Sequence, residues 1–476
     1  MFGSVRVFLD FNLPNATTWF YFSFLLAIAL FFKFGRVFTI RNWDLVMLFL
    51  LVPGLLLVNA AKQMPQASAH VPPQQAAALV ANMTMPGMPA ALADFTAHVR
   101  FGADPARWRW IGYLWLLCGS AYFFLRCLVD LAIVQRPALG PNLEFGGLAW
   151  MSIALMACLT AVAFRQEEST EPIGSSRPRE EVTPAKGQIG PESAWFGLAR
   201  KWVMPPWWMT RGFAVACHLM VVLGLMLIGR IHFGNAASGM AAASLYLLLP
   251  YTGIYVGQVH HVLPSALVVW AFVFLRVPSL SAIFLGMATG AAYFPALVAP
   301  AWIGFYWRRG AGRFAFFYFM TAAITIGLVL LALHLENELE SVWRQTLRQA
   351  AWQPWKAPTG EGFWTGIHGF YRLPVFIAFF AFVLLTPFWP APKNLAHLLA
   401  LTAAVFVGIQ LWYGDQGGVY VLWYLPLILL MTFRPNLQDT RPPLIDAQHD
   451  WASSLASLAA RGVRRLVHRP TPQSTA

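Results

Sequence analysis

The sequence predicts an all-α protein, a polytopic transmembrane helix bundle with about 11–13 spans. Hydrophobic residues make up 58% of its 476 residues and charged residues only 11%, whereas about a quarter of the residues in a soluble domain are charged. Apolar runs of spanning length recur along most of the chain. Aromatic residues form 15% of the chain, and many fall at the ends of these runs, as in an interfacial belt.

The apolar runs predict the spanning helices one after another. Each is bounded by charged residues, prolines or glycines, and each is long enough to cross most of a hydrocarbon core at about 1.5 Å per residue. The predicted spans are 16–32, 43–60, 110–133, 147–164, 211–229, 237–256, 259–276, 314–333, 372–389, 394–412 and 418–433.

The stretch 279–306 is apolar throughout but carries Pro295 and Pro300. It fits either one long tilted helix or two short ones. Arg276 precedes the stretch and a cluster from Arg308 to Arg313 follows it. If both flanks are cytoplasmic, the stretch crosses twice, and the chain has about thirteen spans.

The formal net charge of +13 comes largely from short loops and the C-terminal tail. This distribution is typical of positive-inside topology and of attraction to anionic membrane lipid, and it excludes a nucleic-acid-binding domain. It predicts an outer N-terminus and a cytoplasmic C-terminus. Arg200, Lys201 and Arg211 depart from the rule, since they flank a span on the predicted outer side.

The loops divide the chain into four parts. Residues 1–164 form an N-terminal transmembrane part with an outer loop at 61–109. Residues 165–210 have mixed charge and are rich in Pro, Ser and Gly, which predicts a flexible linker loop. Residues 211–433 form a C-terminal transmembrane core, and 434–476 form a cytoplasmic tail.

One region carries a family resemblance. Gly257-Gln258 and His260-His261 stand at a predicted outer helix end and precede a Gly-rich pair of short helices, and GDQGGVYVLWYLPLIL occupies 414–429. Over about 237–433 the chain resembles the bacterial polyprenyl-phosphate-sugar-dependent GT-C glycosyltransferases, in particular their mannosyltransferase-like branch. It departs from that branch at His260, where members usually have Asn, and at Tyr293, where many have Lys.

The resemblance implies a GT-C-like fold in a bacterial cytoplasmic (inner) membrane. The implied activity is transfer of a sugar from a polyprenyl-phosphate donor to an outer-face acceptor. A carboxylate in an early outer loop would act as base or hold a divalent metal, and Asp94 and Asp104 are the residues available. Their alternative roles are an N-cap or solvated charge for Asp94 and an ordinary turn for Asp104.

The same resemblance implies cations and polar groups that bind the donor. Gln258, His260 and His261 are predicted to contact sugar or phosphate. Outer-loop cations would hold the lipid phosphate; the candidates are Arg344, Arg348, His368 and Arg372. For Arg344 and Arg348, an amphipathic surface helix is the alternative. No metal-ligand spacing is present, and the cofactor and the oligomeric state are not predicted.

Two further polar groups have structural explanations. Arg126 and Asp130 lie four residues apart within a span, which predicts a salt bridge near the cytoplasmic end. His218 is a lone histidine in an apolar helix and is predicted to be a hydrogen-bonded packing residue. Two functions compete with the glycosyltransferase: a catalytically silent GT-C-like membrane protein and a transporter or flippase.

Overall fold

The computed structural model describes residues 16–63, 105–133, 140–165, 207–307, 309–335, 354–356, 361–414 and 416–437. All regular secondary structure in these residues is helical, which confirms the all-helical prediction. The helices are α1 (Ala16–Phe31), α2 (Ile40–Gln63), α5 (Pro105–Ala132), α6 (Phe145–Arg165), α8 (Trp207–Ile231), α9 (Ala236–Leu248), α10 (Pro250–Ile254), α11 (Val259–Val273), α12 (Pro278–Ala291), α13 (Ala299–Phe305), α14 (Ala311–Leu335), α16 (Leu373–Leu385), α17 (Leu395–Trp412) and α18 (Val421–Phe433), with 3-10 turns η1 (Phe34–Arg36), η2 (Phe294–Val298) and η3 (Gly369–Tyr371).

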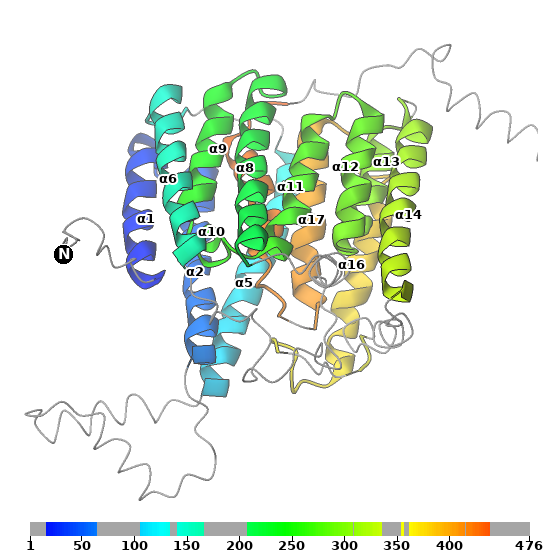
Figure 1. Cartoon of the computed structure of the whole chain (residues 1–476), viewed down its shortest axis with the longest axis horizontal. Helices are drawn as coiled ribbons and strands as arrows, with labels where there is room; N and C mark the ends of the chain where they lie inside the picture. Colours follow the sequence, from blue (N-terminus) through cyan, green and yellow to red (C-terminus); the bar gives the residue numbers. More distant parts are fainter. Residues whose placement is uncertain are drawn as a thin grey trace, which may run out of the picture.

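The described residues include six helices that are long and apolar enough to cross a membrane, together with seven shorter apolar helices. The chain is therefore an integral membrane protein. Figure 1 shows the helices running roughly side by side, from α1 at one edge of the bundle to α14 at the other. Every residue of α18 is buried, so the core of the bundle lies around this last helix and its neighbour α17.

The helices have two common ends. At one end, Lys33 Nζ donates to Asn142 Oδ1 at 2.6 Å, and the Arg276 guanidinium donates to the Ile231 carbonyl at 3.3 Å. We call this the basic end, and it lies uppermost in Figure 1. The opposite end carries His260, His261 and His368 and is called the histidine end.

The structure settles the interpretation of 279–306. Helix α12 stops at Ala291, the chain turns at an extended Ala292, and η2 leads directly into α13. The Tyr306 hydroxyl, just after α13, donates to the Leu275 carbonyl, just before α12, at 2.7 Å. The stretch therefore turns back on itself as two short helices.

The predicted span 237–256 is interrupted. Helix α9 ends at Leu248, Leu249 is extended, and Pro250 begins the short α10. Proline has no N–H to continue a helix and disfavours helical geometry in the residue before it. After this break, α10 leads into the turn that precedes α11.

Helices α8 and α9 approach closely through two glycines. A Cβ added at Gly239 would lie 2.5 Å from the Leu225 carbonyl oxygen and 2.9 Å from the Gly229 Cα. Small residues allow such backbone contacts between membrane helices. The described helices from the two parts 1–164 and 211–433 pack into one bundle, because α5 lies against α17 and α6 against α9.

Candidate functional site

Gln258 and His260 lie at the histidine end, where α11 begins. Gln258 is the extended residue before the helix, and its side chain does not cap it. Its Oε1 is enclosed and makes no hydrogen bond within the described part of the chain. His260 is partly exposed. Both residues are therefore partly exposed at the edge of the bundle, although the Gln258 Oε1 itself is covered.

His261 is placed differently from its neighbour. Its imidazole is 1% exposed and lies between two tyrosine rings, with Tyr255 stacked at 4.0 Å and Tyr420 at 5.2 Å between centroids. The residue links the turn before α11 to the start of α18. The His261 ring is therefore covered from solvent, and it contributes packing to the site.

The start of α18 is joined to α11 by a hydrogen bond. Trp423 Nε1 donates to the His260 carbonyl oxygen at 3.1 Å, and the Trp423 ring stacks on Tyr420 at 4.7 Å. Tyr420 and Trp423, three residues apart in the 414–429 stretch, thus contact the histidine pair through the His261 ring and the His260 backbone respectively. Consequently α18 helps to hold the backbone of His260 in position.

Tyr293 and Arg372 extend this site toward α12 and α16. The Tyr293 hydroxyl lies 3.5 Å from the Tyr413 hydroxyl, and Phe294 packs between Tyr413 and Trp423, at 5.0 and 5.7 Å. Arg372 immediately precedes α16 and is fully buried. The ring contacts therefore connect Tyr293 and Phe294 to the His260 region, and Arg372 lies near enough to Tyr413 for the two side chains to influence each other electrostatically.

Among the described residues, the His368 ring makes its contacts within its own turn, η3. Its ring stacks on Phe370 at 5.3 Å, and its Nδ1 accepts a hydrogen bond from the Phe370 N–H at 3.4 Å. These contacts explain its role as the cap of η3. The remaining predicted residues, Asp94, Asp104, Arg344 and Arg348, lie outside the described residues.

An ion pair that the sequence reasoning missed joins two distant parts of the histidine end. Arg109 Nη1 lies 2.7 Å from Glu361 Oε1, and both side chains are partly exposed. The Gln416 N–H donates to the Glu361 carbonyl oxygen, which attaches Glu361 to the connection between α17 and α18. The only signal in the sequence was a carboxylate flanked by two glycines, Gly360 and Gly362.

The position of this ion pair is informative. Arg109 lies five residues after segment 64–104, which contains Asp94. Glu361 follows segment 336–353, which contains Arg344 and Arg348. The described residues that come after these two segments are therefore in direct contact.

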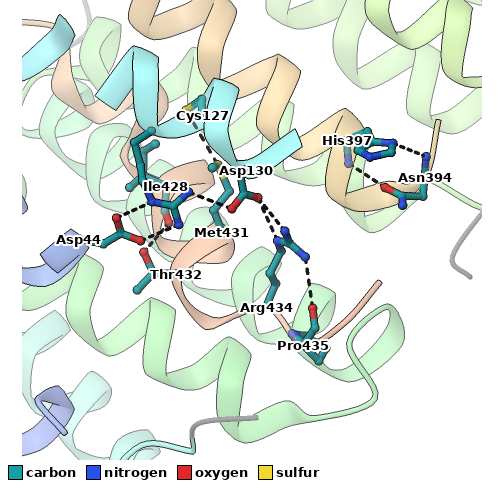
Figure 2. Close-up of polar contacts among 11 residues, drawn as sticks. Asp44, Cys127, Asp130, Asn394, His397, Ile428, Met431, Thr432, Arg434 and Pro435 are labelled. Atoms are coloured by element: carbon teal, nitrogen blue, oxygen red, sulfur yellow. Dashed lines mark hydrogen bonds and ion pairs between the residues drawn. The ribbon is translucent and has the colours of Figure 1, made fainter. Parts of the chain in front are cut away.

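The buried charges of the basic end form a second polar cluster (Figure 2). The predicted Arg126–Asp130 salt bridge is confirmed at 2.9 Å. Arg126 also binds Asp44 on α2 through two hydrogen bonds, of 2.7 and 2.9 Å, and Asp130 accepts from Arg434 at 2.8 Å. Two carboxylates thus balance two guanidinium groups.

Arg434 remains charged at neutral pH. Burial, followed by the charge of Arg126, lowers its pKa to about 10. The network links α2 and α5 to the residue that follows α18, and each charge has an opposite charge beside it. Buried ions in a membrane protein require such pairing. The arrangement is explained as a structural contact between the two ends of the chain.

His218 is buried, and its Nδ1 lies 2.8 Å from the Tyr246 hydroxyl. This confirms the prediction of a hydrogen-bonded packing residue. The described part of the chain contains no group of three or more His, Cys, Asp or Glu that could hold a metal ion.

Comparisons with protein families, with curated proteins and with solved structures found no match to this chain.

Proposed function

We propose that this protein is a membrane glycosyltransferase that moves a sugar from a polyprenyl-phosphate donor to an acceptor at the histidine end. The observation that carries the proposal is the Arg109–Glu361 ion pair at 2.7 Å. It joins the residues that follow segment 64–104, which contains Asp94 and Asp104, to those that follow segment 336–353, which contains Arg344 and Arg348 as well as Glu336, Glu338 and Glu340. A transfer site needs a base near the acceptor and cations near the departing phosphate.

In the proposed reaction, the Asp94 carboxylate takes the proton from the acceptor hydroxyl. The hydroxyl oxygen then forms a bond to C1 of the sugar, and the bond between C1 and the phosphate oxygen breaks. The polyprenyl phosphate leaves with the bonding electrons, and attack from the opposite side inverts the configuration at C1. Arg344 and Arg348 are the proposed cations for the leaving phosphate.

The described residues supply the remaining parts of the proposed site. Gln258 and the adjacent His260 are both partly exposed, so we assign these two polar side chains to contacts with the sugar. Arg372 and His261 are too deeply buried to contact a donor in this arrangement, so we assign them to support of the site through Tyr413 and Tyr420.

The test is donor binding and transfer. Purified protein in lipid nanodiscs is incubated with radiolabelled polyprenyl-phosphate mannose and, separately, polyprenyl-phosphate glucose. We expect retained or transferred label with at least one donor, and loss of transfer in Asp94→Asn. Glu144→Gln, an exposed acid at the basic end, is the matched control and should transfer normally. Absence of bound and transferred label with both donors would favour the catalytically silent alternative.

A further inference from the structure

The loop between α1 and α2 exposes unusually large apolar side chains at the basic end. Phe38 is 88% exposed and Phe34 is 66% exposed, and Val37 and Ile40 are also on the surface. Lys33 and Arg36 lie among them in the sequence. Large apolar side chains interleaved with cations are typical of segments that enter the boundary between headgroups and acyl chains.

Asn42 holds this loop in one conformation. Its side chain is 1% exposed, and its Nδ2 lies 3.1 Å from each of the carbonyl oxygens of Lys33, Arg36 and Val37. Its Oδ1 accepts from the Lys33 backbone N–H at 3.0 Å. The buried Asn42 side chain thus holds the loop backbone in place, while the large side chains of the loop are exposed.

A second asparagine ties the loop to the start of α6. Asn142 Nδ2 donates to the carbonyls of Ala29 and Phe32, at 3.0 and 3.3 Å. Its Oδ1 accepts from the Lys33 ammonium at 2.6 Å. The ammonium is therefore held at a defined place beside the exposed phenylalanines.

The region around the loop has surplus positive charge. Asp44 on α2 is bound by Arg126, and Glu144, two residues after Asn142, is an exposed acid at the same end. Lys33, Arg36 and Arg41 add three further cations. The Arg41 guanidinium lies over the Phe433 ring at 4.5 Å, and burial together with the Arg41 charge lowers the pKa of Lys33.

We propose that loop 33–40 is a binding site for an anionic phospholipid of the leaflet at the basic end. The lipid phosphate lies between Lys33 and Arg36, and its acyl chains lie against Phe34 and Phe38. Charge complementarity selects the ligand, since an exposed ammonium and guanidinium attract an anionic headgroup more strongly than a zwitterionic one. Because Asn42 and Asn142 preorganise the loop, binding costs little additional ordering.

Native mass spectrometry tests this proposal on delipidated full-length protein titrated with phosphatidylglycerol or phosphatidylcholine. The test variant is Lys33→Gln/Arg36→Gln. The matched control is Arg230→Gln/Arg276→Gln, which removes two exposed cations from the same end. At about 1 kcal/mol per basic residue, we expect phosphatidylglycerol affinity to fall by about tenfold or more in the test variant and to change little in the control.

A third variant isolates the apolar contribution. Phe38→Ser should weaken phosphatidylglycerol and phosphatidylcholine by the same factor, since it removes contact with acyl chains only. The proposal is overturned if the test and control variants lose phosphatidylglycerol equally, because the attraction is then a property of the whole basic end. It is also overturned if the wild type binds both lipids with equal affinity.

Discussion

Asp130 on α5 accepts hydrogen bonds from Arg434, 304 positions further along the chain, with Nη2 and Oδ2 2.8 Å apart. Arg126 binds the other oxygen of the same carboxylate. Asp130 therefore connects the third helix of the described fold to the end of the last one. Because both side chains are at most 4% exposed, neither charge can be satisfied by water if its partner is removed.

Removal of Arg434 should strongly destabilise the fold. Arg434→Ala leaves Asp130 with half of its pairing in a buried site, and loss of one partner of a buried pair typically costs about 3–5 kcal/mol. Thermal unfolding in detergent measures the effect. Arg230→Gln, at an exposed arginine of the same end, serves as the control. Equal melting temperatures for Arg434→Ala and the wild type would show that the network contributes nothing to stability.

The Arg109–Glu361 pair should matter for activity more than for stability. Its side chains are 24% and 33% exposed, and exposed pairs contribute about 1 kcal/mol or less. Arg109→Glu should therefore leave the melting temperature nearly unchanged but reduce sugar transfer, because two like charges separate the attached segments. Arg109→Glu/Glu361→Arg restores the pair and should recover transfer. Failure of this double variant to exceed either single variant would rule out the proposed contact.

His261 should be replaceable by an apolar ring. His261→Phe keeps an aromatic side chain between Tyr255 and Tyr420, so stability should change by less than about 1 kcal/mol. His261→Ala removes the ring contacts with Tyr255, His260 and Tyr420, each worth about 0.5–1.5 kcal/mol beyond area burial, and should lower the melting temperature clearly. If His261→Phe proves as damaging as His261→Ala, the imidazole nitrogens have a role that packing does not explain.

Gly239 should not tolerate a side chain. In Gly239→Val the new Cβ meets the Leu225 carbonyl oxygen and the Gly229 Cα, so α8 and α9 must separate. The expected loss is about 1–3 kcal/mol, as for other overpacked sites. Gly327→Val is a control on α14, where an added Cβ meets nothing within 4 Å. The two melting temperatures should differ, and equal values would show that the helices separate without cost.

Lys393 predicts a pH dependence of stability. Its ammonium is 5% exposed and donates to the carbonyls of Pro387 and Pro390 at 2.8 and 3.1 Å. Burial lowers its pKa from 10.5 to about 8. Between pH 8 and 10.5 the unfolded state thus binds more protons than the folded state, and stability rises with pH in this window.

Lys393→Met removes the titrating ammonium and leaves every other ionisable side chain in place. The unfolding free energy of the wild type should therefore increase relative to the variant as the pH is raised from 8 toward 10.5. Urea unfolding at several pH values measures the difference. A difference that stays constant or decreases over this range would contradict the lowered pKa.

The sequence and the structure agree best where the signal is local. The division of 279–306 near Pro295, the span 394–412 and the Arg126–Asp130 spacing all depend on neighbours a few residues away. For the last of these, helical geometry converts the spacing into contact. Asp44 and Arg434 were not expected in the network. Their pairing depends on how α2, α5 and α18 pack, and no pattern along the chain records that packing.

Within the candidate site, the surroundings of Glu361 and His261 were likewise set by packing and not by local sequence. Glu361 had no recognisable motif, and its significance comes from the approach of Arg109. His261 was grouped with His260 because the two are adjacent in the sequence. The two imidazole rings lie 4.4 Å apart, yet His260 is partly exposed while His261 is buried against two tyrosine rings.

The amino-acid sequence alone determined that this protein is a helical membrane protein and which stretches are helical, apart from the break at Leu249, because hydrophobicity and chain-breaking residues act over a single helix length. The tertiary structure decided which buried charges neutralise one another and which loop ends meet at the histidine end. Those choices depend on contacts between residues hundreds of positions apart, whose energies arise only when the helices have packed.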